Sequence, residues 1–96
     1  MREVVLSPKA ERDLDDLFFW IAEQAGPNVA VAYTGRLRSF VVSLDLFPGR
    51  ARVRDDIAPG VRVIGFEGRT NVHYVMTPER VVIVGFDHGG RPYRPA

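Results

Sequence analysis

The chain has 96 residues, of which 46% are hydrophobic and 26% charged, and this size and balance predict a single folded domain spanning residues 1–96. It contains no cysteine, which excludes disulfides, cysteine nucleophiles and thiolate zinc sites. The N-terminus is too charged for a signal peptide and no apolar run approaches the ~20 residues of a membrane span, so we expect a cytoplasmic protein with no membrane contact.

The basic residues are distributed unevenly along the chain. The net charge is only +1, yet Lys9 is the single lysine among the 13 basic residues. Acidic residues crowd the segment 11–16, whereas arginines dominate from Arg36 onward. This asymmetry favours an acidic partner for the second half of the chain, either phosphate or an acidic peptide. A codon bias toward arginine is an equally good explanation of the composition.

The first half of the chain predicts a strand and two helices. Residues 3–6 are a short apolar strand candidate, and Ser7-Pro8 is typical of a helix start, with the serine as N-cap and the proline in the first turn. Gly26-Pro27 ends this helix and begins a second one, which Phe47-Pro48-Gly49 terminates. Both helices carry apolar residues at helical spacing. These are Ala10, Leu14, Leu17, Phe18, Ile21, Ala22 and Ala25, then Ala30, Tyr33, Leu37, Phe40, Val41 and Leu44.

The second half predicts a three-stranded meander over residues 61–86. Its first two strands alternate apolar and polar residues, which indicates one covered face. The third, residues 81–86, is apolar throughout and should be covered on both faces or lie at the centre of the sheet. The helical hairpin is the expected cover. The order is therefore β-α-α-β-β-β, an α+β fold with a helical hairpin packed on a small, mostly antiparallel sheet.

Residues 50–60 form the connector between the second helix and the meander. Arg50, Arg52 and Arg54 alternate there with alanine and valine. An extended connector would present all three guanidinium groups on one side. These arginines are candidates for contact with an acidic protein segment or a phosphate, although Asp55 and Asp56 partly cancel their field.

Several short motifs, in this order, resemble the RelE/ParE superfamily of toxins from bacterial type II toxin–antitoxin modules. The resemblance covers roughly residues 4–91. Each motif is weak alone, but their order is fairly specific. The motifs are Leu6-Ser7-Pro8-Lys9-Ala10-Glu11-Arg12-Asp13-Leu14, Ala30-Val31-Ala32-Tyr33, Leu44-Asp45-Leu46-Phe47-Pro48-Gly49-Arg50, Pro59-Gly60-Val61-Arg62, Val72-His73-Tyr74-Val75 and Phe86-Asp87-His88-Gly89-Gly90-Arg91.

The resemblance implies a toxin neutralised by an antitoxin whose C-terminal segment wraps it in a hetero-oligomer. ParE-like members are taken to poison DNA gyrase by binding, and the opening motif is more similar to this branch. In that interpretation a ParD-like antitoxin or gyrase contacts a set of basic residues, and the toxin acts by binding, without a cofactor and without enzymatic activity of its own. The set is Arg50, Arg52, Arg54, Arg62, His73, His88 and Arg91.

The alternative branch consists of RelE-like toxins, which cut mRNA on the ribosome. RNA cleavage through the 2′-hydroxyl needs a base, a cation on the phosphate and an acid. Arg62, His88 and Tyr93 are the candidates for such a set, but arginine is a poor base because its pKa stays above about 12. A non-toxic, antitoxin-binding relative is a third possibility. Two histidines without cysteine make only a weak case for a metal site. His73 alternates with Val72 and Tyr74, which favours a surface or antitoxin-facing position for its side chain.

Overall fold

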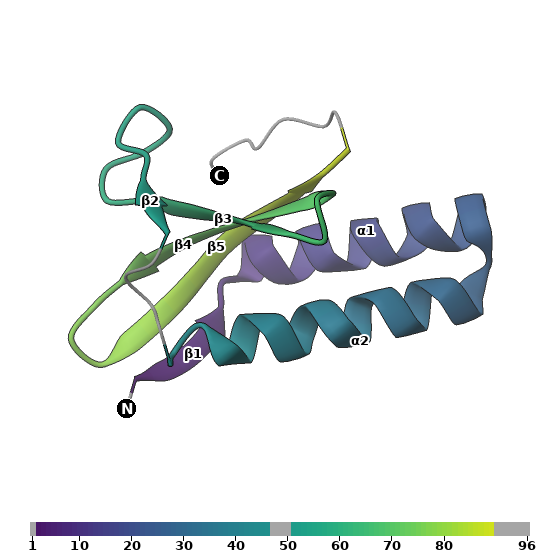
Figure 1. Ribbon diagram of the computed structural model, residues 1–96, viewed down its shortest axis with the longest axis horizontal. Coiled ribbons are helices and arrows are strands. Elements are labelled where there is room, and N and C mark those ends of the chain that lie inside the picture. The colour runs from purple at the N-terminus through teal and green to yellow at the C-terminus, as the bar shows by residue number, and fades with distance from the viewer. Residues whose placement is uncertain (1, 47–50, 90–96) are drawn as a thin grey trace.

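The computed structural model describes residues 2–46 and 51–89 (Figure 1). Five strands form one sheet in the order β1-β5-β4-β3-β2, and two helices, α1 and α2, lie between β1 and β2 in the sequence. The bounds are β1 Glu3–Leu6, α1 Pro8–Ala25, α2 Pro27–Ser43, β2 Arg52–Val53, β3 Arg62–Phe66, β4 Thr70–Met76 and β5 Arg80–His88. β1 pairs with β5 in parallel, and every other neighbouring pair is antiparallel. The predicted α+β architecture is confirmed.

One element departs from the predicted order. Arg52 and Val53 of the expected connector form the short strand β2, which pairs antiparallel with β3. A strand is recognised in a sequence by the alternation of apolar and polar residues, and two residues are too few to show that alternation. The sheet therefore has five strands rather than the expected four. The apolar β5 is an interior strand between β1 and β4, as its composition predicts.

The start of α1 and the junction between the helices follow the residues that were expected to set them, whereas α2 ends at Ser43 and its expected terminator, residues 47–49, lies outside the described residues. The Ser7 hydroxyl accepts a hydrogen bond from the Ala10 amide at 3.1 Å, which satisfies one of the free N–H groups of the first turn of α1. Gly26 has a φ of 98°, a conformation that favours glycine, and there the chain leaves α1 and enters α2 at Pro27. The two helices thus form a tight antiparallel hairpin.

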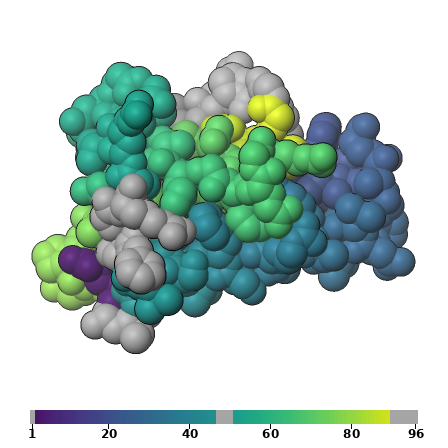
Figure 2. All heavy atoms as spheres, in the orientation of Figure 1, coloured from purple at the N-terminus to yellow at the C-terminus, as the bar shows by residue number. Residues whose placement is uncertain are grey.

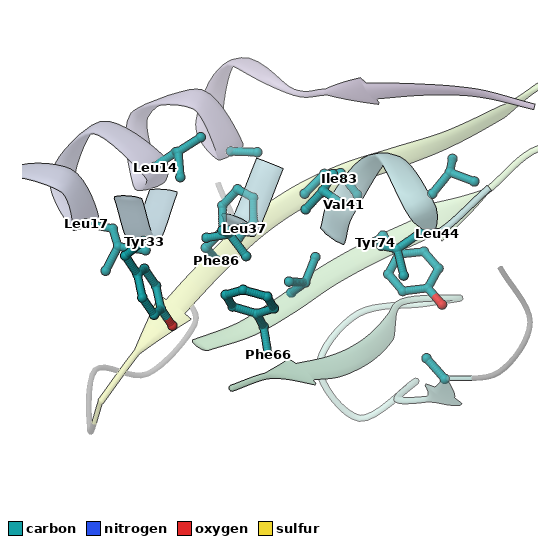
Figure 3. Packing of buried hydrophobic residues seen from close by; sticks show 14 of the residues in the cluster. Leu14, Leu17, Tyr33, Leu37, Val41, Leu44, Phe66, Tyr74, Ile83 and Phe86 are labelled. Carbon is teal, nitrogen blue, oxygen red and sulfur yellow. The ribbon is translucent and has the colours of Figure 1, made fainter. Parts of the chain in front are cut away.

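The core lies between the helical hairpin and one face of the sheet (Figure 3). Leu14 and Leu17 of α1 and Leu37 and Val41 of α2 are at most 4% exposed. Figure 3 shows them packed over residues of β3, β4 and β5 that point at the helices. The strand residues it labels are Phe66, Tyr74, Ile83 and Phe86.

A β-bulge in β5 adapts this strand to the core. Tyr74 of β4 pairs with Ile83, whereas His73 pairs with Gly85, so that Val84 is the extra residue. A bulge shifts the alternation of side chains by one position. Ile83 and Phe86 are three residues apart but both face the helices and are buried.

An aspartate of α1 stabilises the part of β5 that extends beyond β1. The Phe86 amide donates to Asp13 Oδ2 at 3.0 Å, and the Lys9 ammonium lies 2.6 Å from the same oxygen. Because the final pairing of β1 with β5 is Leu6 with Ile83, Phe86 lies beyond the region in which β1 supplies hydrogen bonds. The Asp13-Leu14 pair of the opening motif therefore has a structural role: the aspartate holds β5 and the leucine enters the core.

The end of the helical hairpin projects beyond the sheet (Figures 1 and 2). Ala25 was expected in the apolar stripe of the first helix, but it is exposed. The sheet ends before it can cover this turn. No described helix is long and apolar enough to cross a membrane.

Candidate functional site

The arginines of the connector have different environments. Arg54 makes a bidentate contact with Asp56, with nitrogen–oxygen distances of 2.8 and 2.7 Å. This hydrogen-bonded pair lowers the pKa of the Asp56 carboxyl. Arg52 is exposed, and among the described residues it has no ion pair. Arg50 lies outside the described residues. Arg52 is therefore the connector arginine whose charge is most available to a partner.

Arg62 lies at one end of the sheet and His88 at the other. Arg62 of β3 is opposite Tyr74 of β4, whereas His88 of β5 is opposite Thr70 of the same strand. Four residues along a strand span roughly 13 Å. Arg62 donates to the Ala51 carbonyl at 2.9 Å, which anchors the connector to the sheet. The structure therefore separates two members of the RNA-cleavage set, and the third, Tyr93, lies outside the described residues, as does Arg91.

His73 is buried, so the expectation of a surface position is wrong. It does point away from Val72 and Tyr74, toward the face of the sheet opposite the helices, but it is only 2% exposed. Its Nε2 lies 2.6 Å from Asp87 Oδ2, and Asn71 donates to the other oxygen of that carboxylate at 2.9 Å. Burial lowers the pKa of His73, and the hydrogen bond to Asp87 opposes this effect. The sequence shows alternation but not the complementary carboxylate on β5.

His88 takes part in a polar network at the opposite end of the sheet from Arg62. Its Nδ1 lies 2.7 Å from the Thr70 hydroxyl, which lies 2.6 Å from the Tyr33 hydroxyl. Thr70 is 1% exposed, so the shared hydroxyl is sealed from water. The His88 ring also makes edge contacts with the rings of Trp20 and Tyr33, with centroids 5.1 and 5.7 Å apart. His88 thus connects α1, α2 and the sheet.

The β3–β4 turn is tied to α2 beside this network. Arg36 makes a bidentate contact with the Glu67 carboxylate at 2.8 and 3.0 Å and lies over the Tyr33 ring, 5.4 Å from its centroid. The pair lowers the pKa of Glu67. In the three-residue loop between the paired residues Phe66 and Thr70, Glu67 has a φ of 52° and Gly68 a φ of 69°, both in the left-handed region. A glutamate is unusual at such a position, and its ion pair offsets the backbone strain.

An apolar pocket of about 140 Å³ opens between β1 and the helical hairpin. Val4 and Leu6 of the edge strand β1 form one wall, Leu37 and Val41 of α2 form another, and Val42 stands at the rim with 64% of its surface exposed. Arg38 also lines the pocket and makes a long contact of 3.4 Å with Glu11, with both side chains about half exposed. The pocket is thus suited to an apolar side chain next to a carboxylate.

Sequence analysis missed several residues of these networks. Tyr33 was assigned to the core stripe, and it is indeed buried, but its hydroxyl also serves the His88 network. Trp20 is not part of the apolar stripe of the first helix, and its ring contacts that of His88. Asp13 and Asp87 gave no signal beyond their place in short motifs. In the part of the chain that the structure describes, no three histidine or acidic side chains gather as a metal site would require.

Comparisons with known proteins agree with this architecture. A family model described as the ParE toxin of the type II toxin–antitoxin system parDE matches residues 4–93. The chain is 33% identical over 84 residues to Toxin ParE3 of Caulobacter vibrioides, covering 88% of this chain and 83% of that protein. It also superposes on a chain of the chromosomal ParDE TA system from P. aeruginosa with a TM-score of 0.81 and 21% identity, covering 93% and 97% of the two chains, which supports the fold. The chain therefore belongs to the ParE toxin family of type II toxin–antitoxin systems.

Proposed function

We propose that this ParE-type toxin inhibits DNA gyrase by binding to it and is neutralised by a ParD-like antitoxin. The observation that carries the proposal is the match of the ParE family model to residues 4–93, nearly the whole chain. The positions of the histidines are consistent with a binding function. His73 is hydrogen-bonded to Asp87 and His88 to Thr70, and both histidines support the fold.

The separation of Arg62 from His88 also favours binding over RNA cleavage. A catalytic base and a phosphate-binding cation must reach the same phosphodiester, which requires hydrogen-bond distances from one substrate. A gap of roughly 13 Å along the sheet is several times such a distance. The chain retains the fold of the superfamily without bringing these two groups together.

The pocket beside β1 is the proposed anchor point for the antitoxin. An apolar side chain of the antitoxin enters between Val4 and Val41, and a neighbouring carboxylate pairs with Arg38. β1 is an edge strand with only β5 as neighbour, so an extended antitoxin segment is able to pair with its outer edge. This arrangement also covers Val42, which is 64% exposed at the rim of the pocket.

The test uses the toxin purified away from its antitoxin. We expect it to inhibit gyrase supercoiling and to accumulate cleaved DNA, and expect addition of the antitoxin to restore supercoiling. A parallel cell-free translation reaction distinguishes the superfamily branches. Cuts in ribosome-bound mRNA with gyrase unaffected would assign the chain to RNA cleavage, and inactivity in both assays would leave an antitoxin-binding relative without toxicity.

A further inference from the structure

Helix α1 carries two exposed aromatic residues, Phe19 and Trp20, of which, among the described residues, only Trp20 contacts a ring of the sheet, that of His88. Phe19 is 64% exposed and Trp20 is 40% exposed, although both belong to residue types that folding normally buries. The Phe19 ring contacts Phe18 edge-on, with centroids 5.5 Å apart, and this leaves most of it in solvent. Both Phe19 and Trp20 belong to the C-terminal half of α1, the helix that leads to the turn extending past the sheet in Figure 1. We name Phe19 and Trp20 the aromatic tip.

Acidic side chains lie beside Phe19 along α1. On a helix, the neighbours of a residue are three and four positions away. For Phe19 these positions include Asp15, Asp16 and Glu23, all of which are exposed. Arg12 stands one turn earlier and offsets part of this charge. An apolar centre with a charged rim is the usual composition of a protein-binding surface, and here the rim is negative.

The charge of the rim selects among possible partners. Phosphate would be repelled, so the tip is not suited to nucleic acid. An acidic antitoxin segment would be repelled in the same way. A two-fold dimer through this face would place the acidic rims of two copies against each other, because such an interface uses the same patch twice. A protein surface with lysine or arginine around an apolar recess is complementary.

We infer that the aromatic tip, with its acidic rim, is the surface with which this toxin docks onto a basic surface of its target protein. The inference rests on the proposed function, which supplies the target. Enzymes that act on DNA must present basic surfaces, so an acidic toxin surface is electrostatically matched to such a protein. Val42 at the rim of the antitoxin pocket lies 15 residues along α2 from Pro27, roughly 22 Å, whereas Phe19 lies seven residues before Gly26 on α1, roughly 10 Å from the same turn. Phe19 and Val42 are thus separated by roughly 12 Å along the hairpin. Neither Phe19 nor Trp20 lines the pocket, so target and antitoxin contact different parts of the hairpin.

The test uses one variant of the apolar centre and one of the acidic rim, each with a matched control. Phe19→Ser removes the aromatic ring, and its control is Leu46→Ser, because Leu46 is also 64% exposed. Asp16→Arg reverses a rim charge, and its control is Glu79→Arg, an equal charge change at an exposed position of the β4–β5 turn. Inhibition of gyrase supercoiling and antitoxin affinity are measured for all four and for the unmodified toxin, with oligomeric state followed by light scattering.

The expected result is a loss of target inhibition with retention of the antitoxin. Phe19→Ser and Asp16→Arg should each need about tenfold more protein for half-inhibition, the loss typical of a central interface residue, whereas antitoxin affinity stays within about twofold. Both controls should inhibit like the unmodified toxin. If the two variants also inhibit normally, the inference is wrong. An equal loss of antitoxin affinity would assign the tip to the antitoxin instead of the target. A toxin dimer that Phe19→Ser dissociates would assign the tip to a second copy of the toxin. Failure of the unmodified toxin to inhibit gyrase would refute the proposed function as well.

Discussion

Replacing Thr70 with valine tests the network that fixes His88. Valine keeps the shape of threonine but removes the hydroxyl that lies 2.6 Å from the Tyr33 oxygen and 2.7 Å from His88 Nδ1. Tyr33 is only 6% exposed, so its hydroxyl would lose a buried partner that water cannot readily replace. Leaving a buried polar group unsatisfied costs about 1–3 kcal/mol. The weakened contact with half-buried His88 adds to this, so we expect a loss of about 2–4 kcal/mol.

The magnitude is large for a protein of this size. Domains are stable by about 5–15 kcal/mol, and 1 kcal/mol shifts the melting temperature of a small domain by about 4–8 °C. Urea unfolding of Thr70→Val should therefore show a midpoint far below that of the unmodified protein. Tyr33→Phe removes one hydroxyl and leaves Thr70 with His88, so it should cost less, about 1 kcal/mol. The double variant should lose less than the sum of the two.

The reasoning would be refuted by an unfolding free energy for Thr70→Val within about 0.5 kcal/mol of the unmodified protein, the range expected for substitutions away from such networks. Full additivity in the double variant would also contradict it, since Tyr33 and Thr70 would then act independently. The same unfolding curves also give the slope of the unfolding free energy against urea concentration. An altered slope would indicate a change in the unfolded state rather than loss of the hydrogen bonds.

Three further predictions concern separate parts of the molecule. Because burial lowers the pKa of His73 from its ordinary 6.5, the folded state favours the neutral ring, and the free energy of unfolding should fall as the pH drops below about 6.5. Unfolding measured from pH 8 to 5 should show this fall, and the variant His73→Gln should show a smaller one. Val42→Asp places a carboxylate at the rim of the apolar pocket and should weaken antitoxin binding at least about tenfold in a titration, whereas Val31→Asp, on the same helix and 60% exposed, should not. Leu37→Ala, at a fully buried core position, should lower the unfolding free energy by about 2–5 kcal/mol, and a loss below 1 kcal/mol would contradict the packing.

Local residue patterns predicted most of the fold. Ser7, Gly26 and Pro27 act through adjacent backbone groups, and the alternation in β4 depends on which face is covered. Such features depend on residues close together in the sequence, and they can therefore be predicted from the sequence. The strand β2 was missed because its pairing with β3 is a tertiary interaction of only two residues.

The candidate site was less predictable because its networks join distant segments. His73 looked like a surface residue from alternation, but Asp87, 14 positions away, makes its burial tolerable. The Tyr33–Thr70 contact joins residues 37 positions apart. The acidic residues 15, 16 and 23 are visible in the sequence, but the exposure of the neighbouring Phe19 is a property of the tertiary structure.

Gyrase assayed with the purified toxin alone is the most direct measurement of the central claim. The assay follows relaxed plasmid with increasing toxin and scores both supercoiling and linear, cleaved DNA. The account predicts that supercoiling falls as cleaved DNA accumulates, and that the antitoxin reverses both effects. Undiminished supercoiling and no cleaved DNA at toxin in large excess over gyrase would contradict it.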